Sequence, residues 1–251
     1  MLRALFSRSP PAVSEIEILF AGVRYPVSVK RNRQARRYTL RIQASTRDVL
    51  ITMPTRGSLK EARAFAERNG AWIATRLSRL PEAAPFVDGA TVPLRGVRHR
   101  IAHRRGTRGT VWVEAGDDGE VLCVAGDAPH IARRVTDFLK RQARQDLEAA
   151  SRRHAAALGV KVARVSVRDT TSRWGSCSTS GRLSYSWRLV LAPSFVLDYL
   201  TAHEVAHLVE MNHSPRFWRV VRKICPDADR AKSWIDVHGA ELHRYGLPDI
   251  A

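Results

Sequence analysis

The sequence predicts an α+β fold, in which a strand-rich first part is followed by a helical second part. Between residues 15 and 125, short segments alternate apolar and polar residues and end at Gly, Pro or Asp-Gly, which is typical of strands and turns. After residue 129, apolar residues recur at helical spacing over long segments. A His-Glu-x-x-His pattern on one of these segments indicates a metal site. We therefore expect a flexible tail at residues 1–14, a basic, β-rich N-terminal region at 15–127 and a second domain at 128–251.

Four strands and one helix are expected at the start of the N-terminal region. Ala21-Gly22 separates the first two strands, which predicts a hairpin. Ser58 and Glu61 have the spacing of a capping box, so a helix should begin there and run to about Leu80, with Gly70 weakening its middle. The expected strands are residues 15–20, 23–30, 38–42 and 48–54.

More strands follow between residues 85 and 125, separated by turns that contain Gly. His99 and His103 lie four residues apart, but on a strand this spacing does not bring two side chains onto one metal ion. We therefore expect both to be surface residues. The expected strands are residues 91–94, 98–102, 111–113 and 121–124.

The second domain should begin with a long helix, residues 129–159, which is rich in Ala, Arg and Leu. A strand from Val160 to Arg168 and a small, polar turn segment, residues 172–181, come next. The following strand, Arg182 to Leu189, should direct the side chains of alternate residues to one face. Those residues are Leu183, Tyr185, Trp187 and Leu189.

His203, Glu204 and His207 form the chemical centre of the sequence. Residues four apart on a helix lie on one face, so the two imidazoles can bind one metal ion. Glu204 lies beside the first histidine, where it can hold a water molecule without being a ligand. Pro193 suits the start of this helix.

His213 is the favoured third ligand. Ser214-Pro215 is an N-cap followed by proline at the first helical position, so a new helix should begin there and the metal helix should end near Asn212. His213 would then lie in the corner between two helices, from which its ring can turn back to the metal. Glu210 and Glu241 are the competing third ligands. Three imidazoles leave one tetrahedral position for water, which is typical of catalytic zinc, with Glu204 as the general base on the zinc-bound water.

A hairpin from Trp174 to Leu191 precedes the metal helix, and its edge strand could pair with an extended peptide. Trp174 and Trp187 are more typical of a core than of substrate contacts, and Cys177 of a turn than of a metal ligand. Three side chains are candidates for polarising the oxyanion, although Arg188 should face away from Tyr185 on a regular strand. They are Arg173, Tyr185 and Arg188.

The net charge of +18 is concentrated in the N-terminal half. Residues 1–110 hold 22 Lys and Arg but only 7 Asp and Glu, which raises nucleic acid or a nucleotide as a partner. Arginine is abundant throughout the chain, however, and scattered arginines usually form a solvated surface. No signal peptide or membrane span is evident, and three widely spaced cysteines suggest no disulfide framework. We expect a cytoplasmic protein without membrane contact.

Several motifs resemble the YgjP-like family of zinc metallopeptidase-related proteins, relatives of the SprT-like zincins. The match is specific over about residues 165–240 and weaker over residues 36–41 and the strand that ends at Pro54. The motifs are Arg173-Trp174-Gly175-Ser176-Cys177-Ser178, Trp187-Arg188-Leu189, the HExxH motif at His203–His207, Asn212-His213-Ser214 and Phe217-Trp218. Ser186 departs from the pattern, because Asn is expected before Trp-Arg-Leu.

The resemblance implies a zincin-like metallohydrolase domain at residues 128–251, with helices and a β-hairpin or sheet. It also implies metal ligands at His203, His207 and His213 and a catalytic Glu204. The leading hypothesis is a zinc-dependent metallopeptidase that acts on a peptide or protein. One alternative is a metal-dependent hydrolase of a nucleotide phosphoanhydride, and another is a nucleic-acid-associated protease or binding protein.

Overall fold

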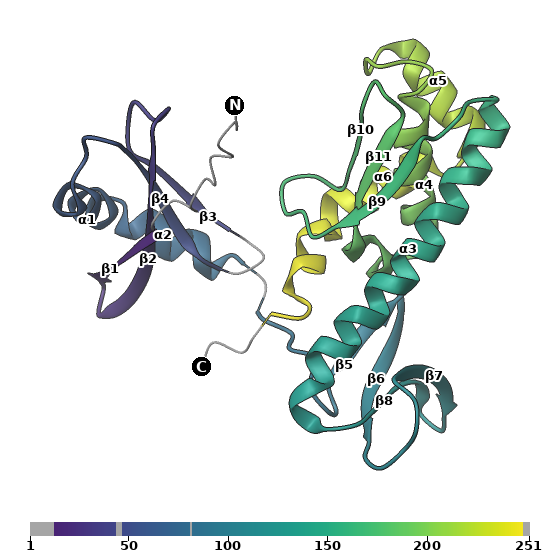
Figure 1. The fold of residues 1–251 in the computed structure, drawn as a ribbon, viewed down its shortest axis with the longest axis horizontal. Coiled ribbons are helices and arrows are strands. Elements are labelled where there is room, and N and C mark those ends of the chain that lie inside the picture. The colour runs from purple at the N-terminus through teal and green to yellow at the C-terminus, as the bar shows by residue number, and fades with distance from the viewer. Residues whose placement is uncertain (1–12, 44–46, 81, 248–251) are drawn as a thin grey trace, which may run out of the picture. The chain divides into compact units, whose positions relative to one another are not determined.

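The computed structural model describes residues 13–43, 47–80 and 82–247. Within these ranges the protein has the expected mixed α+β architecture, with three small sheets and six α-helices (Figure 1). The chain divides into two compact units, residues 1–81 and 82–251. The tail expected at residues 1–14 lies almost wholly outside the described residues.

The first unit is a four-stranded sheet with two helices on it. The expected hairpin is present, because β1 (Val13–Phe20) pairs antiparallel with β2 (Val23–Asn32). β2 then pairs in parallel with β4 (Val49–Pro54), which pairs antiparallel with β3 (Thr39–Ile42). Alternate residues of β4 are buried, so one face of the sheet forms a core with the helices.

The helix expected over residues 58–80 is divided into α1 (Leu59–Arg68) and α2 (Gly70–Ser78). The predicted capping box of Ser58 and Glu61 is present at its start. The interruption has a tertiary cause, because a Cβ atom at Gly70 would lie 2.6 Å from the ring of Phe20. Glycine thus allows the chain to pass close to β1, and the helix changes direction there.

The second unit contains two sheets and a long helix. One sheet has the strand order β5-β6-β8-β7, and the other has β10-β11-β9. The first sheet comprises β5 (Thr91–Leu94), β6 (Val97–Arg104), β7 (Val111–Gly116) and β8 (Gly119–Ala125). The second comprises β9 (Arg164–Arg168), β10 (Gly175–Cys177) and β11 (Arg182–Ser186).

Helix α3 (Ile131–Leu158) joins the two sheets of this unit. Its 28 residues span about 42 Å, and Gly159 ends it in the left-handed conformation. Residues of β5, β6, β8, α3 and α4 (Ser194–Ala206) share one hydrophobic core. The sequence suggested a domain division between residues 127 and 128. That position lies inside the second unit, because α3 shares a core with strands that precede the division and with a helix that follows it.

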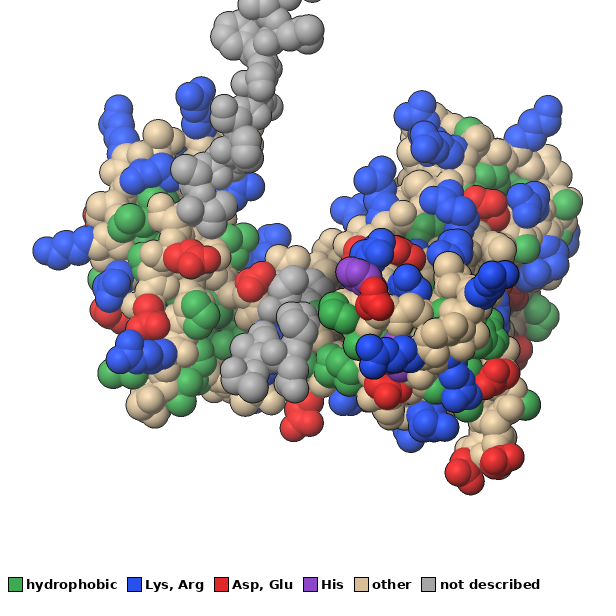
Figure 2. Space-filling model, turned by 60° about the horizontal axis from the view of Figure 1, so that its bottom comes forward, with side chains coloured by type: hydrophobic (Ala, Val, Ile, Leu, Met, Phe, Trp, Pro, Cys, Tyr) green, Lys and Arg blue, Asp and Glu red, His purple; other side chains and the backbone are tan. Residues whose placement is uncertain are grey.

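The remaining helices pack around α4, which itself contacts β10. They are α5 (Pro215–Ile224) and α6 (Ala228–His238), followed by the 3-10 segment Gly239–Arg244. No helix in the described ranges is both long and apolar enough to cross a membrane. Lys and Arg side chains are scattered over the visible face of each unit, with Asp and Glu among them (Figure 2).

The strand expected to reach Leu189 is shorter than predicted. β11 ends at Ser186, and residues 187–191 form a 3-10 helix instead of a strand. The hydroxyl of Ser186 accepts a hydrogen bond from the amide of Arg188 at 3.4 Å, so it caps this short helix. The residue that departs from the family pattern therefore has a structural role at the strand end.

Candidate metal centre

Helix α4 positions His203 and Glu204 and ends earlier than the sequence predicted. The helix was expected to continue to about Asn212, but it ends at Ala206, with His207 as its C-cap. The amides of Leu208 and Val209 donate to carbonyls three residues back, at 3.0 Å each. These tighter bonds replace the helical ones and turn the chain away directly after His207.

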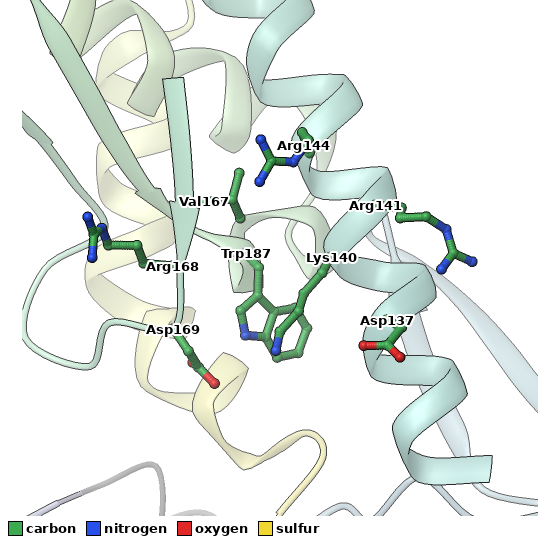
Figure 3. A pocket seen from close by; sticks show the side chains of 8 residues that line it. All are labelled: Asp137, Lys140, Arg141, Arg144, Val167, Arg168, Asp169 and Trp187. Atoms are coloured by element: carbon green, nitrogen blue, oxygen red, sulfur yellow. The ribbon is translucent and has the colours of Figure 1, made fainter. Parts of the chain in front are cut away.

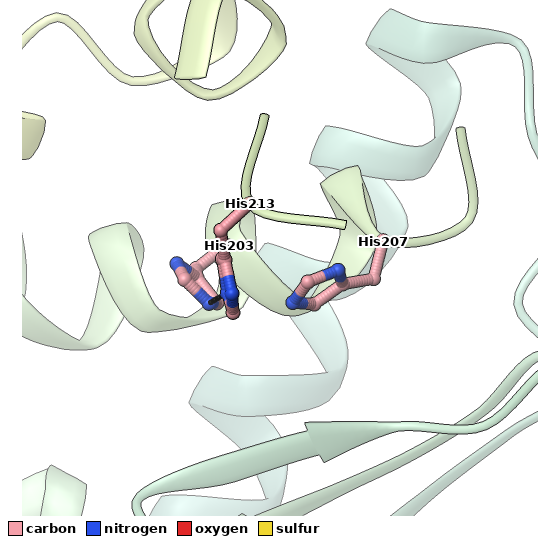
Figure 4. Close-up of side chains that lie close together, drawn as sticks. All are labelled: His203, His207 and His213. Carbon is pink, nitrogen blue, oxygen red and sulfur yellow. Dashed lines mark hydrogen bonds between the residues drawn. The ribbon is translucent and has the colours of Figure 1, made fainter. Parts of the chain in front are cut away.

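The three predicted histidines lie together. One ring nitrogen from each of His203, His207 and His213 lies within 4.8 Å of the others, and the rings converge on a common point (Figure 4). The Nε2 atoms of His203 and His213 are 3.0 Å apart. Two histidines come from α4 and its C-cap, and the third comes from the loop before α5.

The loop reaches the cluster because α5 begins where the sequence predicted. Ser214 is its N-cap, and the hydroxyl accepts a hydrogen bond from the amide of Phe217 at 3.3 Å. The amide of Ser214 donates to the carbonyl of Asn212 at 2.8 Å, which makes the corner tight. His213 lies in this corner and is exposed to solvent.

Phe217 holds the three rings from one side. Its ring centroid lies 4.9 Å from that of His203, 4.5 Å from that of His207 and 4.8 Å from that of His213. The phenyl ring is fully buried, so it fixes the imidazoles by contact and excludes water behind them. Trp218 stacks on His213 with a centroid separation of 6.0 Å.

Burial keeps two of the imidazoles neutral near pH 7. It lowers the pKa of His203 to about 4, and the neighbouring His207 and His213 add to this shift. Burial also lowers the pKa of His207. Nδ1 of His207 lies 3.2 Å from the carbonyl oxygen of Glu210, so as a donor it leaves Nε2 free for a ligand bond.

These residues fit a metal ion. Neutral imidazole is the form that binds metals, and the donor set of three nitrogens suits zinc. Nδ1 of His203 is buried and has no hydrogen-bond partner among the described residues, whereas its Nε2 faces the other two rings. Three imidazole nitrogens this close together can share one cation.

Glu204 lies next to this cluster in an apolar setting. Its side chain is 5% exposed, and burial raises the pKa of the carboxyl to about 7, while the charge of Arg173 opposes the shift. Gly175 of β10 lies directly against it, since a Cβ atom there would be 2.4 Å from Oε1. Glu204 is therefore held between its own helix and β10.

The two competing third ligands lie outside the cluster. The side chain of Glu210 pairs with Arg216 at 3.7 Å, and only the backbone carbonyl of Glu210 contacts His207. Glu241 is exposed and lies 3.8 Å from Nδ1 of His238. Neither carboxylate belongs to the group of donor atoms formed by the three histidines.

Two of the three candidates for polarising an oxyanion have structural partners instead. Tyr185 is buried, and its hydroxyl lies 3.2 Å from that of Ser151 on α3. Arg188 is 4% exposed; it donates to Asp169 at 3.0 Å and to three carbonyls near the C-terminus. Because Arg188 lies in the 3-10 segment, the strand alternation expected for it does not apply. Arg173 is exposed and acts electrostatically on Glu204.

The tryptophans occupy the positions expected of core residues. Trp187 is buried, with the guanidinium of Arg188 4.6 Å from its ring, and the half-buried Trp174 stacks on His243 at 4.9 Å. Cys177 lies on β10 and not in a turn. Burial, with a contribution from Glu204, raises the pKa of this thiol to about 11, so it stays protonated near pH 7.

His99 and His103 each place a ring nitrogen against a backbone carbonyl. His99 was expected at the surface but is buried, with Nδ1 2.8 Å from the carbonyl of Val97. Nε2 of His103 lies close to the carbonyl of Gly126. The sequence did not predict the contacts that Gly175 and Phe217 make with the centre. Only the Phe217 contact had a signal in the sequence, which is the position of Phe217 three residues after the N-cap Ser214.

Comparison with known proteins adds a family. The model of the YgjP-like metallopeptidase domain matches residues 36–238 of the chain. Among solved structures, the crystal structure of the metallopeptidase zymogen of Pyrococcus abyssi abylysin is similar, with 26% sequence identity and a TM-score of 0.34. That similarity covers 39% of this chain and 97% of the other. Among curated proteins, none matches.

Proposed function

Because the chain belongs to the YgjP-like metallopeptidase family, we propose that it is a zinc-dependent peptidase with Glu204 as its general base. His203, His207 and His213 would hold the ion. The observation that carries this proposal is the convergence of three imidazole nitrogens, with a buried carboxylate on the residue directly after the first of them. Membership of the family supports peptide hydrolysis with a metal; zinc and the individual roles are inferred from the donor set and its surroundings.

The chemistry of the donors supports zinc. Three neutral imidazoles with an open side are typical of catalytic zinc sites. When bound, zinc acts as a Lewis acid that polarises a carbonyl and acidifies water. His213 is exposed, so the cluster is accessible from its side. Phe217 and Trp218 close another side with aromatic rings.

Glu204 is suited to proton transfer. Its pKa of about 7 in the absence of a metal allows the carboxylate both to accept a proton and to release it near neutral pH. The carboxylate would take a proton from the water that attacks the carbonyl carbon and return it to the departing amine as the C–N bond breaks. Gly175 limits the space around Oε1 and so restricts the carboxylate to few orientations.

The position of strand β10 is suited to binding an extended peptide substrate. It lies at one edge of the sheet, in the order β10-β11-β9, and Gly175 at its start touches Glu204. A peptide that pairs with this edge through backbone hydrogen bonds would pass the carboxylate. A single strand edge beside the base therefore can present a peptide bond in a defined orientation.

The proposal is tested by metal analysis together with hydrolysis assays. Purified wild-type protein should contain one zinc ion per chain and should hydrolyse casein, whereas Glu204→Gln should retain the zinc and lose the activity. A nucleoside triphosphate is assayed in parallel, because metal-assisted attack on phosphorus is the alternative reaction. Hydrolysis of the triphosphate but not of casein, lost in the same variant, would replace the peptidase proposal.

A further inference from the structure

A groove on the second sheet has an unusual lining. It encloses about 750 Å³ beside β9, β10 and β11 and the loops that join them. Arg164, Arg168, Arg173 and Arg182 line it, most of the other lining residues are Ser or Thr, and none of them is Asp or Glu. The groove thus combines positive charge with hydroxyl groups.

Strand alternation produces this surface. On β9, Arg164, Ser166 and Arg168 point to one side, while Val165 and Val167 pack against the core on the other. The pairing register continues the pattern across the sheet. Arg182 lies opposite Arg164, and Ser184 lies between Ser166 and Ser176. The whole outer face of this small sheet is therefore built of arginine and serine.

The charges of this face are not neutralised by ion pairs with any residue that the structure describes. Arg164, Arg168 and Arg182 have no ion-pair partner among the residues that the structure describes. Arg164 and Arg182 are also direct neighbours across two strands, so their positive charges lie side by side. A surface lined by one sign of charge raises the local concentration of oppositely charged ligands.

Two other cavities of the second unit differ from this groove, because carboxylates accompany their cationic side chains. The cavity of about 450 Å³ between α3 and β9 contains Asp137 and Asp169 together with Lys and Arg (Figure 3). In the cavity of about 430 Å³ between α3 and α4, Arg95 pairs with Asp146 at 2.7 Å, and Arg153 pairs with Asp198. Only the groove beside β10 among these three presents arginine without a carboxylate.

The groove shares strand β10 with the candidate catalytic centre. Ser176 and Cys177 of β10 line it, and Gly175 at the start of the same short strand touches Glu204. Arg173, another lining residue, is close enough to Glu204 to act on its charge. A peptide that pairs with β10 would therefore lie beside both the carboxylate and part of the groove lining.

We propose that this groove binds an acidic segment of the peptide substrate, next to the bond that is cleaved. Its Asp and Glu side chains would pair with Arg164, Arg168 and Arg182, because the planar guanidinium matches a carboxylate with two parallel hydrogen bonds. The serine hydroxyls add neutral hydrogen bonds along the segment. The inference rests on the proposed peptidase function and names the substrate class for that same site.

The test uses the zinc-loaded full chain with Glu204→Gln, so that bound peptide is not consumed. Two fluorescent peptides are compared by anisotropy, identical except that Asp and Glu in one carry Asn and Gln in the other. At about 50 mM salt the acidic peptide should bind about tenfold more tightly, and this preference should shrink at higher salt. The triple variant Arg164→Gln, Arg168→Gln, Arg182→Gln should lose the preference.

A matched control removes the same charge elsewhere. Arg105, Arg108 and Arg133 are exposed arginines of the second unit outside the groove, and their replacement by Gln should leave the preference intact. Equal binding of the two peptides, or a preference that survives in the groove variant, would overturn the proposal. So would a single-stranded oligothymidylate that displaces the acidic peptide at physiological salt from the wild-type groove but not from the variant, because the occupant would then be a polynucleotide.

Hydrolysis separates this inference from the function on which it rests. Zinc-loaded wild type should cleave the acidic peptide faster than its neutral twin, chiefly through a lower KM. Cleavage of both at equal rates would overturn the groove assignment alone. Cleavage of neither, with the binding preference intact, would overturn the peptidase chemistry and still support the groove as an acidic-peptide site.

Discussion

Gly175 and Glu204 are in contact across β10 and α4, and no other residue type fits at position 175 without moving the carboxylate. A Cβ atom there would stand 2.4 Å from Oε1 and 2.7 Å from Cγ of Glu204. The glycine does not adopt a positive φ, so space and not backbone conformation requires it. A residue twenty-nine positions earlier in the chain thereby determines where the candidate base lies.

We expect Gly175→Ala to lower kcat by about 10- to 100-fold, because displacing a catalytic group by about 1 Å can cost that much. The zinc content should stay normal, because the three histidines come from α4, its C-cap and the following loop. Steady-state hydrolysis of a peptide and metal analysis of the same sample measure the two effects. A wild-type kcat would show that the carboxylate tolerates the displacement or is not the base.

Glu204→Gln should stabilise the metal-free protein above neutral pH. Burial raises the pKa of Glu204 to about 7 from a usual value of 4.5, so the unfolded chain loses this proton at lower pH than the folded chain does. The wild type therefore loses stability between about pH 4.5 and 7, by up to about 3 kcal/mol, and the loss is constant above that.

Denaturant unfolding of the two metal-free proteins between about pH 5 and 8 measures this difference. Glu120→Gln, which changes an exposed glutamate of the same unit, is the matched control and should follow the wild type. A difference between Glu204→Gln and wild type that does not grow with pH would mean that Glu204 is ionised at little cost in the fold.

His213→Ala should weaken zinc binding by at least about 100-fold, since even groups that only support a ligand contribute 10- to 100-fold. Competition with a chromogenic chelator measures the affinity. His238→Ala is the control, because His238 lies on α6 outside the donor group. Unchanged affinity in His213→Ala would favour a carboxylate as the third ligand, and Glu210 would be the first to examine.

Ser214→Ala should reduce zinc affinity as well as local stability. Loss of its N-cap hydrogen bond to Phe217 costs about 1 kcal/mol and loosens both the corner that holds His213 and the ring that contacts all three histidines. Ser58→Ala removes an equivalent cap in the first unit. It should cost similar stability there without changing zinc affinity, and equal zinc affinities for the two variants would contradict the role of the Ser214 cap.

Much of the candidate centre follows from short-range pattern. His203 and His207 share a helix face because of their spacing, and Ser214-Pro215 predicts the helix start that turns His213 back. The capping box at Ser58 and the hairpin around Ala21-Gly22 follow for the same reason. Each of these features depends on residues within a few positions of one another, so the local sequence contains the information.

Contacts between distant residues explain two of the predictions that failed. Gly70 divides a helix because Phe20 lies over it. Arg188 was a candidate for the active centre, yet it holds Asp169 and the backbone near the C-terminus. The partners of such residues lie elsewhere in the chain, and only folding identifies them.

The sequence alone thus determined the type of fold, the three histidines and the carboxylate beside them, because helix period, strand alternation and caps are local properties. Tertiary structure decided that Phe217 contacts all three rings, that Gly175 confines Glu204, and that the arginines of β9 and β11 form one groove beside β10. Strand pairing and core packing set these relations, because they bring together segments whose separation along the chain carries no pattern.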